Sequence, residues 1–285
     1  MTQQLSPALI KELRDRTGVG MAKCKEALAH TSGDIEEAIA HLRKSGMASA
    51  VKKESRETKE GLIFAAQNDK HICLLEVNAE TDFVAKNDLF QEMSKNMLTD
   101  ALEGEFSDLE AFKTSKYSKD PSLSIDEYRA YVVQTLGENL QIKRLQLISK
   151  QEQQSYAIYS HMGGKILSFV AIEGSDQASE LAKELAMHVA AEAPEYLNEA
   201  QVPESIRAQE EEIAKTQAAN SGKPDFVIQK IVDGKLNSYY DQNCLLRQKF
   251  IKDSQLSITA LLEQKSKELS SPLKIKEYLR WTVGS

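Results

Sequence analysis

The residue types most able to do chemistry, the histidines and cysteines, are scattered along the chain. They are His30, His41, His71, His161 and His188, together with Cys24, Cys73 and Cys244. None has a neighbour at the spacing of a metal site or a disulfide framework. The motifs GxxxxGK[ST], GxSxG, HExxH and GxGxxG are missing as well. The sequence therefore predicts neither an enzyme active site nor a bound metal or cofactor.

Two of the histidines have distinctive surroundings. His188 lies in the apolar run 186–191, where we expect a hydrogen-bonded packing role. His161 precedes Met162 in a predicted turn, where we expect it to be exposed. An α/β enzyme built on His161 or Cys73 is an alternative that the missing motifs disfavour.

One segment breaks the local pattern of the sequence. Residues 80–87, Glu-Thr-Asp-Phe-Val-Ala-Lys-Asn, follow a strand predicted to be buried and precede a predicted helix. Thr81 and Asp82 are suited to cap that helix, and Phe83 is suited to the core. The alternative is a carboxylate and a large aromatic ring displayed together on a turn, where the ring anchors in another protein. The residues alone leave both interpretations open.

The composition favours proteins or small molecules as partners. The chain has 285 residues, a formal net charge of −7, 41% hydrophobic residues and 28% charged residues. These values are typical of a globular protein with two or three compact units, and the acidic excess disfavours sequence-independent binding of nucleic acid. No uncharged apolar run reaches the roughly 18 residues that cross a bilayer. Residues 1–7 lack the character of a signal peptide, so we expect a cytoplasmic protein with reduced cysteines.

Three short helices are expected in the first 54 residues, where they would form a small helical bundle. Ser6 caps the first helix, and the second covers about residues 21–30. The third begins after Asp34, carries apolar residues at helical spacing and is expected to end at Gly46. The charged stretch 51–60 that follows is interpreted as a solvated tether.

The remaining sequence predicts two copies of a β-β-α-β unit. In the first copy, strands are expected at 62–66, 72–77 and 140–148, and a helix at about 88–102. In the second copy, strands are expected at 156–160, 166–172 and 273–281, and a helix at about 178–191. The two copies share little sequence identity, so the common order of elements supports an internal duplication.

The second copy is longer by roughly 40 residues, and the excess lies near 202–240. Apolar residues recur at helical spacing at Ile206 and Ile213, and again at Val227 and Ile231. A break is expected at 221–224, between the two runs. We therefore expect a helical hairpin with a thin apolar seam. Either its two helices pack only on each other, or the hairpin meets a partner.

Two motifs resemble the elongation factor Ts family, the nucleotide exchange factors of elongation factor Tu. The first motif is Leu-Arg-Asp-Arg-Thr-Gly-Val-Gly-Met at 13–21, continued at 24–28 and 33–46. The second is Glu-Val-Asn-Ala-Glu-Thr-Asp-Phe-Val-Ala-Lys-Asn at 76–87. Weaker similarities follow at 136–139, 161–164, 186–191, 221–224 and 278–281, so the resemblance covers the whole chain.

The resemblance implies an α+β fold in three parts. Residues 1–54 are expected to form a three-helix domain similar to ubiquitin-associated domains, 55–150 a core N-subdomain and 151–285 a core C-subdomain. The core is expected to be a duplicated β-β-α-β unit with antiparallel sheets, and a coiled-coil hairpin is inserted at about 202–240. The family's short C-terminal module is expected to be absent. Dimerisation through the hairpin stays open.

The resemblance also implies a function in which no covalent bond is made or broken. In the family, a Thr-Asp-Phe-Val stretch enters the GTPase domain of elongation factor Tu near its magnesium ion, and the matching residues here are Thr81, Asp82, Phe83 and Val84. Further contacts with the GTPase are implied for Arg14, Met21, His161, Met162 and Gly163. We expect an exchange factor that promotes GDP release so that GTP can bind, with no cofactor, nucleic acid or membrane. The alternative is a ubiquitin-type or nascent-chain binding module.

Overall fold

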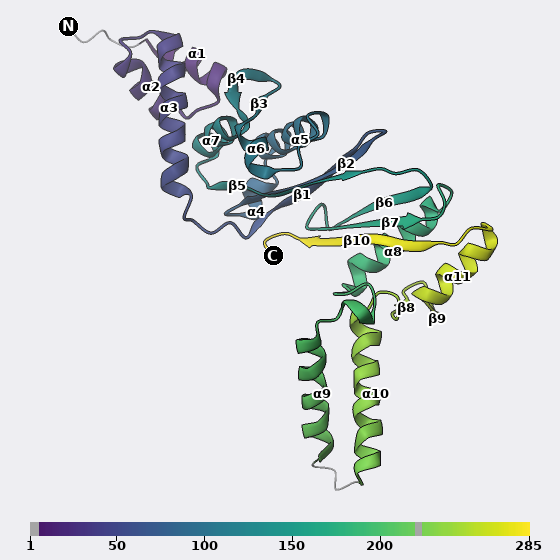
Figure 1. Ribbon diagram of the computed structural model, residues 1–285. Coiled ribbons are helices and arrows are strands. Elements are labelled where there is room, and N and C mark those ends of the chain that lie inside the picture. Colours follow the sequence, from purple (N-terminus) through teal and green to yellow (C-terminus); the bar gives the residue numbers. More distant parts are fainter. Residues whose placement is uncertain (1–5, 220–223) are drawn as a thin grey trace. The chain divides into compact units, whose positions relative to one another are not determined.

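The computed structural model describes residues 6–219 and 224–285, which form an α+β fold (Figure 1). Its internal contacts divide the chain into two units. The first consists of Met1–Lys150, Met162–Lys165 and Thr282–Ser285, and the second of Gln151–His161 and Ile166–Trp281. None of the helices within the described residues is long and apolar enough to cross a membrane.

The first unit opens with three helices, α1 (Pro7–Thr17), α2 (Met21–His30) and α3 (Ile35–Lys53). The Ser6 hydroxyl accepts a hydrogen bond from the backbone N–H of Ala8 (3.2 Å), which confirms the predicted cap. The helices bury a small cluster of their own, made of Ile10, Leu13, Val19, Cys24, Ala27, Leu28, Ala38 and Leu42.

Helix α3 does not end at Gly46, as the sequence predicted, but continues to Lys53. Gly46 is buried where α3 packs on α7 (Ile125–Leu136). A Cβ atom at Gly46 would lie 2.9 Å from Oε1 of Gln134 on α7. The glycine is therefore explained by the close approach of two helices, and its cost to the helix is small enough to tolerate.

The segment that follows α3 is mostly exposed, as its charge predicted, but it is not a free tether. The buried side-chain amide of Asn78 donates to the carbonyl oxygen of Thr58 (3.1 Å). The buried amide of Asn139 donates to the carbonyl oxygen of Arg56 (3.0 Å). Buried side-chain amides thus hold the backbone of residues 54–59 in position. The composition of the segment does not predict these contacts, because the amides come from distant residues.

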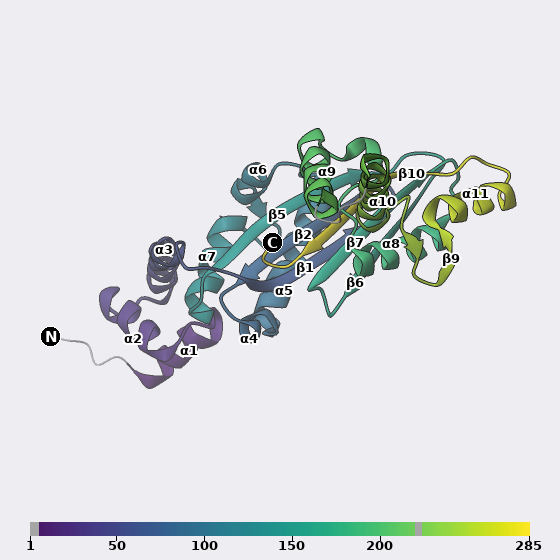
Figure 2. The same ribbon diagram turned by 90° about the horizontal axis from the view of Figure 1, so that it is seen from below.

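The first sheet has the strand order β1-β2-β5 and is antiparallel throughout. Its strands are β1 (Glu60–Gln67), β2 (His71–Ala79) and β5 (Leu140–Ser149), as predicted. Between β2 and β5 lie α4 (Asp82–Ala85), α5 (Asp88–Glu103), α6 (Leu109–Thr114), β3 (Lys116–Tyr117), β4 (Asp120–Ser124) and α7. Helices α5 and α7 cover one face of the sheet (Figures 1 and 2) and bury Phe90, Met93, Met97 and Val133 against it.

The second unit repeats this plan with the strand order β10-β7-β6. Its elements are β6 (Gln154–His161), β7 (Ile166–Glu173), α8 (Ser179–Glu192), the 3-10 turn η1 (Glu199–Gln201), β8 (Lys249–Phe250), β9 (Asp253–Ser257), α11 (Ile258–Glu268) and β10 (Lys274–Thr282). His161 is exposed as predicted, but it is the last residue of β6, paired with Ile166, and not part of the turn.

The duplication extends further than the sequence predicted. Each copy contains a small two-stranded ribbon before its last helix, β3–β4 in one and β8–β9 in the other, and both ribbons shift register at the same step. Each following helix is capped by a serine, Ser124 for α7 and Ser257 for α11. The repeating unit is therefore β-β-α-ββ-α-β. Strands of two to five residues are too short for hydrophobic periodicity to reveal.

The predicted insertion is a helical hairpin of α9 (Glu204–Ala219) and α10 (Asp225–Asn243). Of the predicted seam residues, Ile206, Val227 and Ile231 are half-buried, whereas Ile213 is exposed. The fully buried residues of the hairpin are Ala214, Ala218 and Val232. Of the break predicted at 221–224, residues 221–223 lie outside the described residues.

The base of the hairpin is closed by main-chain hydrogen bonds. The backbone N–H of Leu245 donates to the carbonyl oxygen of Tyr196 (2.8 Å), and that of Leu246 donates to the carbonyl oxygen of Leu197 (3.0 Å). Tyr196 and Cys244 also form a parallel bridge. The chain therefore leaves and re-enters the second unit at adjacent positions.

The predicted packing role of His188 is confirmed. The ring is buried, with Nε2 3.0 Å from Oε1 of Gln248, and its Nδ1 accepts from the backbone N–H of Ile251 (3.4 Å). The neutral tautomer protonated on Nε2 satisfies both contacts. Burial lowers the pKa of the His188 imidazole below its ordinary value.

We expect His188 to make the protein less stable as the pH falls below about 6.5, the ordinary histidine pKa. In that range the unfolded chain binds a proton that the folded protein resists, so protonation favours unfolding. Above that range neither state is protonated at this residue, and the effect vanishes. Urea unfolding at pH 7.5 and 5.5 tests this, with His188→Gln as the comparison. If both proteins lose the same free energy of unfolding between the two pH values, the assignment to His188 is wrong.

Candidate functional site

The segment singled out in the sequence forms a one-turn helix, α4, directly after β2 (Figure 1). Thr81 caps this short helix and not the predicted one at 88–102, which is capped by Asn87. The Thr81 backbone is extended, and its hydroxyl accepts from the N–H of Val84 (3.3 Å). Ala85 is buried and Val84 packs against the core of the first unit. The inner side of the turn is thereby anchored, and its outer side is free to present other residues.

Phe83 is that presented residue. Its side chain is 81% exposed, so the interpretation of Phe83 as a core residue is wrong. An aromatic ring gains free energy when it is removed from water, so a ring this exposed gains nothing until a partner protein covers it. The geometry suits an anchor that enters a cavity on another protein.

Asp82 lies beside Phe83 as a charged carboxylate. Its Oδ2 accepts from the Lys86 ammonium, one helical turn on, at 2.6 Å. This hydrogen bond holds the pKa of the Asp82 carboxyl below its ordinary value, and the nearby charge of Lys165 acts in the same direction. The carboxylate is therefore ionised at neutral pH and displayed together with the ring.

Met162 and Gly163 lie in a turn that belongs to the same unit as α4. The turn is held on β1, because the carbonyl oxygen of Gly164 accepts from the N–H of Ile63 (2.8 Å). The Lys165 ammonium forms an ion pair with Glu60, also on β1. Met162 has a left-handed backbone (φ +51°) and a side chain that is 69% exposed. The turn thus adds a second exposed apolar side chain to this unit.

Within the described residues, the other predicted contact residues form no hydrogen bond or ion pair with α4. Arg14 is exposed on α1, and Met21 is exposed at the first residue of α2. His161 belongs to the second unit, where its Nδ1 lies 3.2 Å from the Tyr159 hydroxyl. Their inclusion in the site rests on the resemblance alone.

Glu138 is the functional candidate that sequence reasoning missed. Its carboxylate accepts from both the backbone N–H and the hydroxyl of Thr81. The similarity at 136–139 marked this stretch without giving it a role. The contact spans 57 positions of the sequence, and no local pattern predicts such a pairing.

Two observations bear on the alternative of an enzyme built on His161 or Cys73. Among the described residues, no three His, Cys, Asp or Glu side chains group as metal ligands. The three cysteines are buried, and burial raises the pKa of the Cys73 thiol to about 12. A thiol with such a pKa is protonated at neutral pH and is a poor nucleophile.

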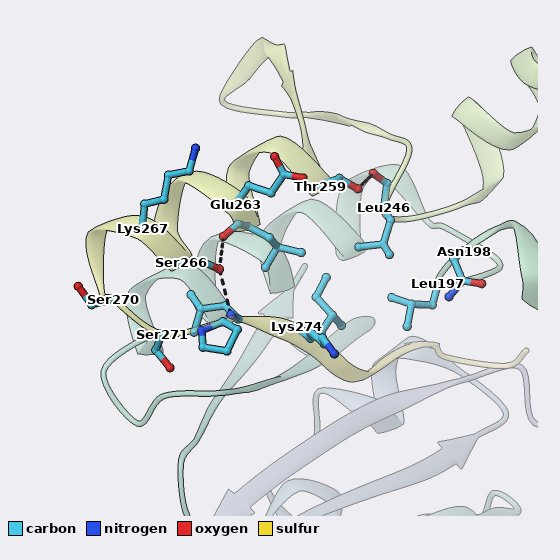
Figure 3. A pocket seen from close by; sticks show the side chains of 14 residues that line it. Leu197, Asn198, Leu246, Thr259, Glu263, Ser266, Lys267, Ser270, Ser271 and Lys274 are labelled. Atoms are coloured by element: carbon cyan, nitrogen blue, oxygen red, sulfur yellow. Dashed lines mark hydrogen bonds between the residues drawn. The ribbon is translucent and has the colours of Figure 1, made fainter.

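A pocket of about 700 Å³ lies in the second unit, between α11 and the start of β10 (Figure 3). Its wall is braced by Ser266, whose hydroxyl donates to the carbonyl oxygen of Leu262 (2.7 Å) and accepts from the N–H of Leu273 (2.9 Å). None of the predicted site residues lines it. The candidate site lies instead on the turn with the exposed Phe83, and an exposed ring suits a protein partner better than a small molecule.

Comparisons with known proteins cover almost the whole chain. The family model described as "Elongation factor TS" matches residues 80–285. Elongation factor Ts of Protochlamydia amoebophila (strain UWE25) is 55% identical over 280 residues, which is 98% of this chain and 99% of that protein. The proteins of the same name from Chlamydia pneumoniae and Chlamydia muridarum are 46% and 43% identical, over 97% of both chains in each case. The chain thus belongs to the elongation factor Ts family of translation elongation factors.

Proposed function

We propose that this protein is a guanine nucleotide exchange factor for elongation factor Tu. It binds the GDP form of that GTPase, disturbs its magnesium and phosphate site and promotes GDP release, so that GTP can bind. The observation that carries the proposal is the exposed Phe83 ring beside the ionised Asp82 on an anchored turn. Protruding groups of this kind can enter a site on a partner but cannot enclose a substrate.

The physical basis is the sensitivity of a nucleotide site to small displacements. In a P-loop GTPase, GDP is held by loop amides, a lysine and a magnesium ion that bridges phosphate and protein. Magnesium demands near-ideal octahedral geometry, so a small shift of its surroundings removes much of its binding. In our proposal Phe83 wedges beside the helix that shapes this site, and Asp82 disturbs the magnesium shell.

Thermodynamic linkage supplies the cycle. If the factor weakens GDP binding, nucleotide weakens binding of the factor by the same ratio. Incoming GTP therefore expels the factor, which is free to act again. No covalent bond forms or breaks, so the protein is not an enzyme in the chemical sense, and its place of action is the cytoplasm, where translation proceeds.

We assign supporting roles to the other predicted residues. Thr81 and Val84 hold the turn, while Arg14, Met21, His161, Met162 and Gly163 add contacts with the GTPase. We also propose the division into a domain similar to ubiquitin-associated domains at 1–54 and two core subdomains at 55–150 and 151–285. The first unit has its longest continuous segment up to Lys150, and this end supports the proposed boundary between residues 150 and 151.

The test is stopped-flow release of a fluorescent GDP analogue from preloaded elongation factor Tu. The parent protein should accelerate release, and the double variant Asp82→Ala/Phe83→Ala should not. The chain offers a matched control in Asp225→Ala/Phe226→Ala. These residues form a second Asp-Phe-Val sequence with an exposed ring, at the start of α10. The control should retain most of the activity.

The release rates of the three proteins test the proposed function and the proposed site separately. Fast release with the parent and the control, but not with the Asp82/Phe83 variant, supports both the function and the site. Fast release with all three proteins keeps the function and moves the site to the Met162 turn or to the three N-terminal helices. If the parent does not accelerate release, the proposed function is wrong.

A further inference from the structure

We infer that Glu138 is a positioning residue for nucleotide exchange: its carboxylate fixes Thr81 and so aims Asp82 and Phe83 at the partner. The inference rests on the proposed function and adds a residue to its machinery. Glu138 is half-buried in the connection between α7 and β5, and it acts through Thr81.

The contact uses both oxygens of the carboxylate. The backbone N–H of Thr81 donates to Oε2 of Glu138 (3.0 Å), and the Thr81 hydroxyl donates to Oε1 (2.7 Å). A hydroxyl has a single proton, so this bond leaves a lone pair directed at the N–H of Val84. Two charge-assisted hydrogen bonds therefore fix the residue that caps α4.

A second carboxylate crosses in the opposite direction. Oε1 of Glu80 accepts from the backbone N–H of Asn139 (2.6 Å) and is also paired with Arg56 (3.3 Å). Each of the two connections, 80–81 and 138–139, thus gives a carboxylate to the backbone of the other. Neither connection can move without breaking hydrogen bonds at both.

The support beneath Glu138 is rigid. Helix α7 is followed by its C-cap residue Gly137, whose left-handed backbone (φ +86°) turns the chain and whose N–H donates to the carbonyl oxygen of Val133 (3.0 Å). Immediately afterwards, Leu140 pairs with Ala79 in the sheet. We call the paired contacts of Glu138 with Thr81 and of Glu80 with Asn139 the Glu138 clamp. This clamp lies between the end of a packed helix and the first paired residues of two neighbouring strands.

The second Asp-Phe-Val sequence shows what the clamp adds. Phe226 is 67% exposed, comparable to Phe83, and it also lies in the first turn of a helix. The N-cap residue of that helix is Pro224, which makes no side-chain cap hydrogen bond. Exposure of the ring is thus common to both sequences, whereas a fixed cap distinguishes Phe83. A rigid base matters because an exposed anchor must enter its pocket in one orientation.

The inference is tested with Glu138→Gln, measured at saturating concentrations of the variant. A carboxamide offers one acceptor oxygen, so one of the two Thr81 donors loses its partner. We expect the maximum rate of GDP release to fall about tenfold. In the Phe83→Ala background the same substitution should cause a clearly smaller further loss, because only Asp82 is left to be aimed. Amide hydrogen exchange in residues 81–84 should become faster in the free variant.

The matched control is Glu127→Gln. Glu127 accepts from the backbone N–H of Ser124 (2.7 Å) at the other end of α7, so it perturbs the same helix without touching Thr81. Its release rate should equal that of the parent. If Glu138→Gln lowers the rate by the same factor with and without Phe83, Glu138 acts independently of the ring and the inference is overturned. Parent-like release by Glu138→Gln also overturns it, whereas an inactive parent overturns the proposed function itself.

Discussion

Phe83→Ala is expected to reduce the acceleration of GDP release from elongation factor Tu by at least about 30-fold, the effect of losing an interface hot spot of about 2 kcal/mol. The same change should leave thermal unfolding of the free protein almost unaltered. Because the side chain is 81% exposed, its truncation leaves no cavity and removes no core contact. Activity and stability therefore separate at this residue.

The measurement is the release rate as a function of factor concentration, together with the unfolding temperature of each variant. Phe83→Leu serves as an intermediate, since it keeps apolar volume but loses the flat ring. The wedge hypothesis expects the order parent, Leu, Ala in release rate at equal stability. Stimulation by Phe83→Ala at the parent level would contradict it, and a shared loss of stability and activity would place Phe83 in the fold.

Gly61→Ala is expected to destabilise the protein by about 3 kcal/mol. Gly61 lies on β1 with a backbone φ of +141°, which side chains of L-residues rarely adopt. A Cβ atom there would lie 2.3 Å from the carbonyl oxygen of Val77 and 2.6 Å from Cα of Asn78 on β2. Both obstacles are backbone atoms of a central strand, so neither can move aside cheaply.

Gly20→Ala is the matched control in the same unit. Gly20 precedes α2 with an ordinary backbone φ of −58°. Apart from its two chain neighbours, no described residue has an atom within 4 Å of the position that the added methyl group would take. Its replacement should cost less than about 1 kcal/mol. Urea unfolding followed by circular dichroism compares the two variants. Equal midpoints would show that the β1–β2 ladder relaxes around the added methyl group.

The sequence predicted the elements whose signals are local. Alternating and continuous apolar runs located the strands of both sheets, and Ser6 marked the start of α1 as a cap. Local signals failed where a distant residue decides the outcome. Gly46 is typical of a helix end, yet it is placed by contact with Gln134 on another helix. The charged stretch after α3 is fixed by Asn78, which comes 20 positions later.

Prediction of the candidate site from the sequence has the same limit. The types and order of Thr81, Asp82 and Phe83 allowed either a core turn or a displayed one, and exposure settled that question only in three dimensions. The resemblance to a family selected this segment, because it carries information from many related chains. It did not reveal the Glu138 clamp, because a hydrogen bond between distant positions leaves no pattern in a single sequence.

The closed base of the α9–α10 hairpin has an evolutionary consequence. Since the chain leaves at Tyr196 and returns at Leu245 with hydrogen-bonded backbones, the ends of the hairpin already meet. A segment with adjoining ends can be gained, lost or exchanged in one genetic event without altering the path of the surrounding chain. The ribbon β8–β9 that follows keeps the register of its counterpart in the other copy. The adjoining ends therefore allow the hairpin to change in length without any change in the path of the chain around it.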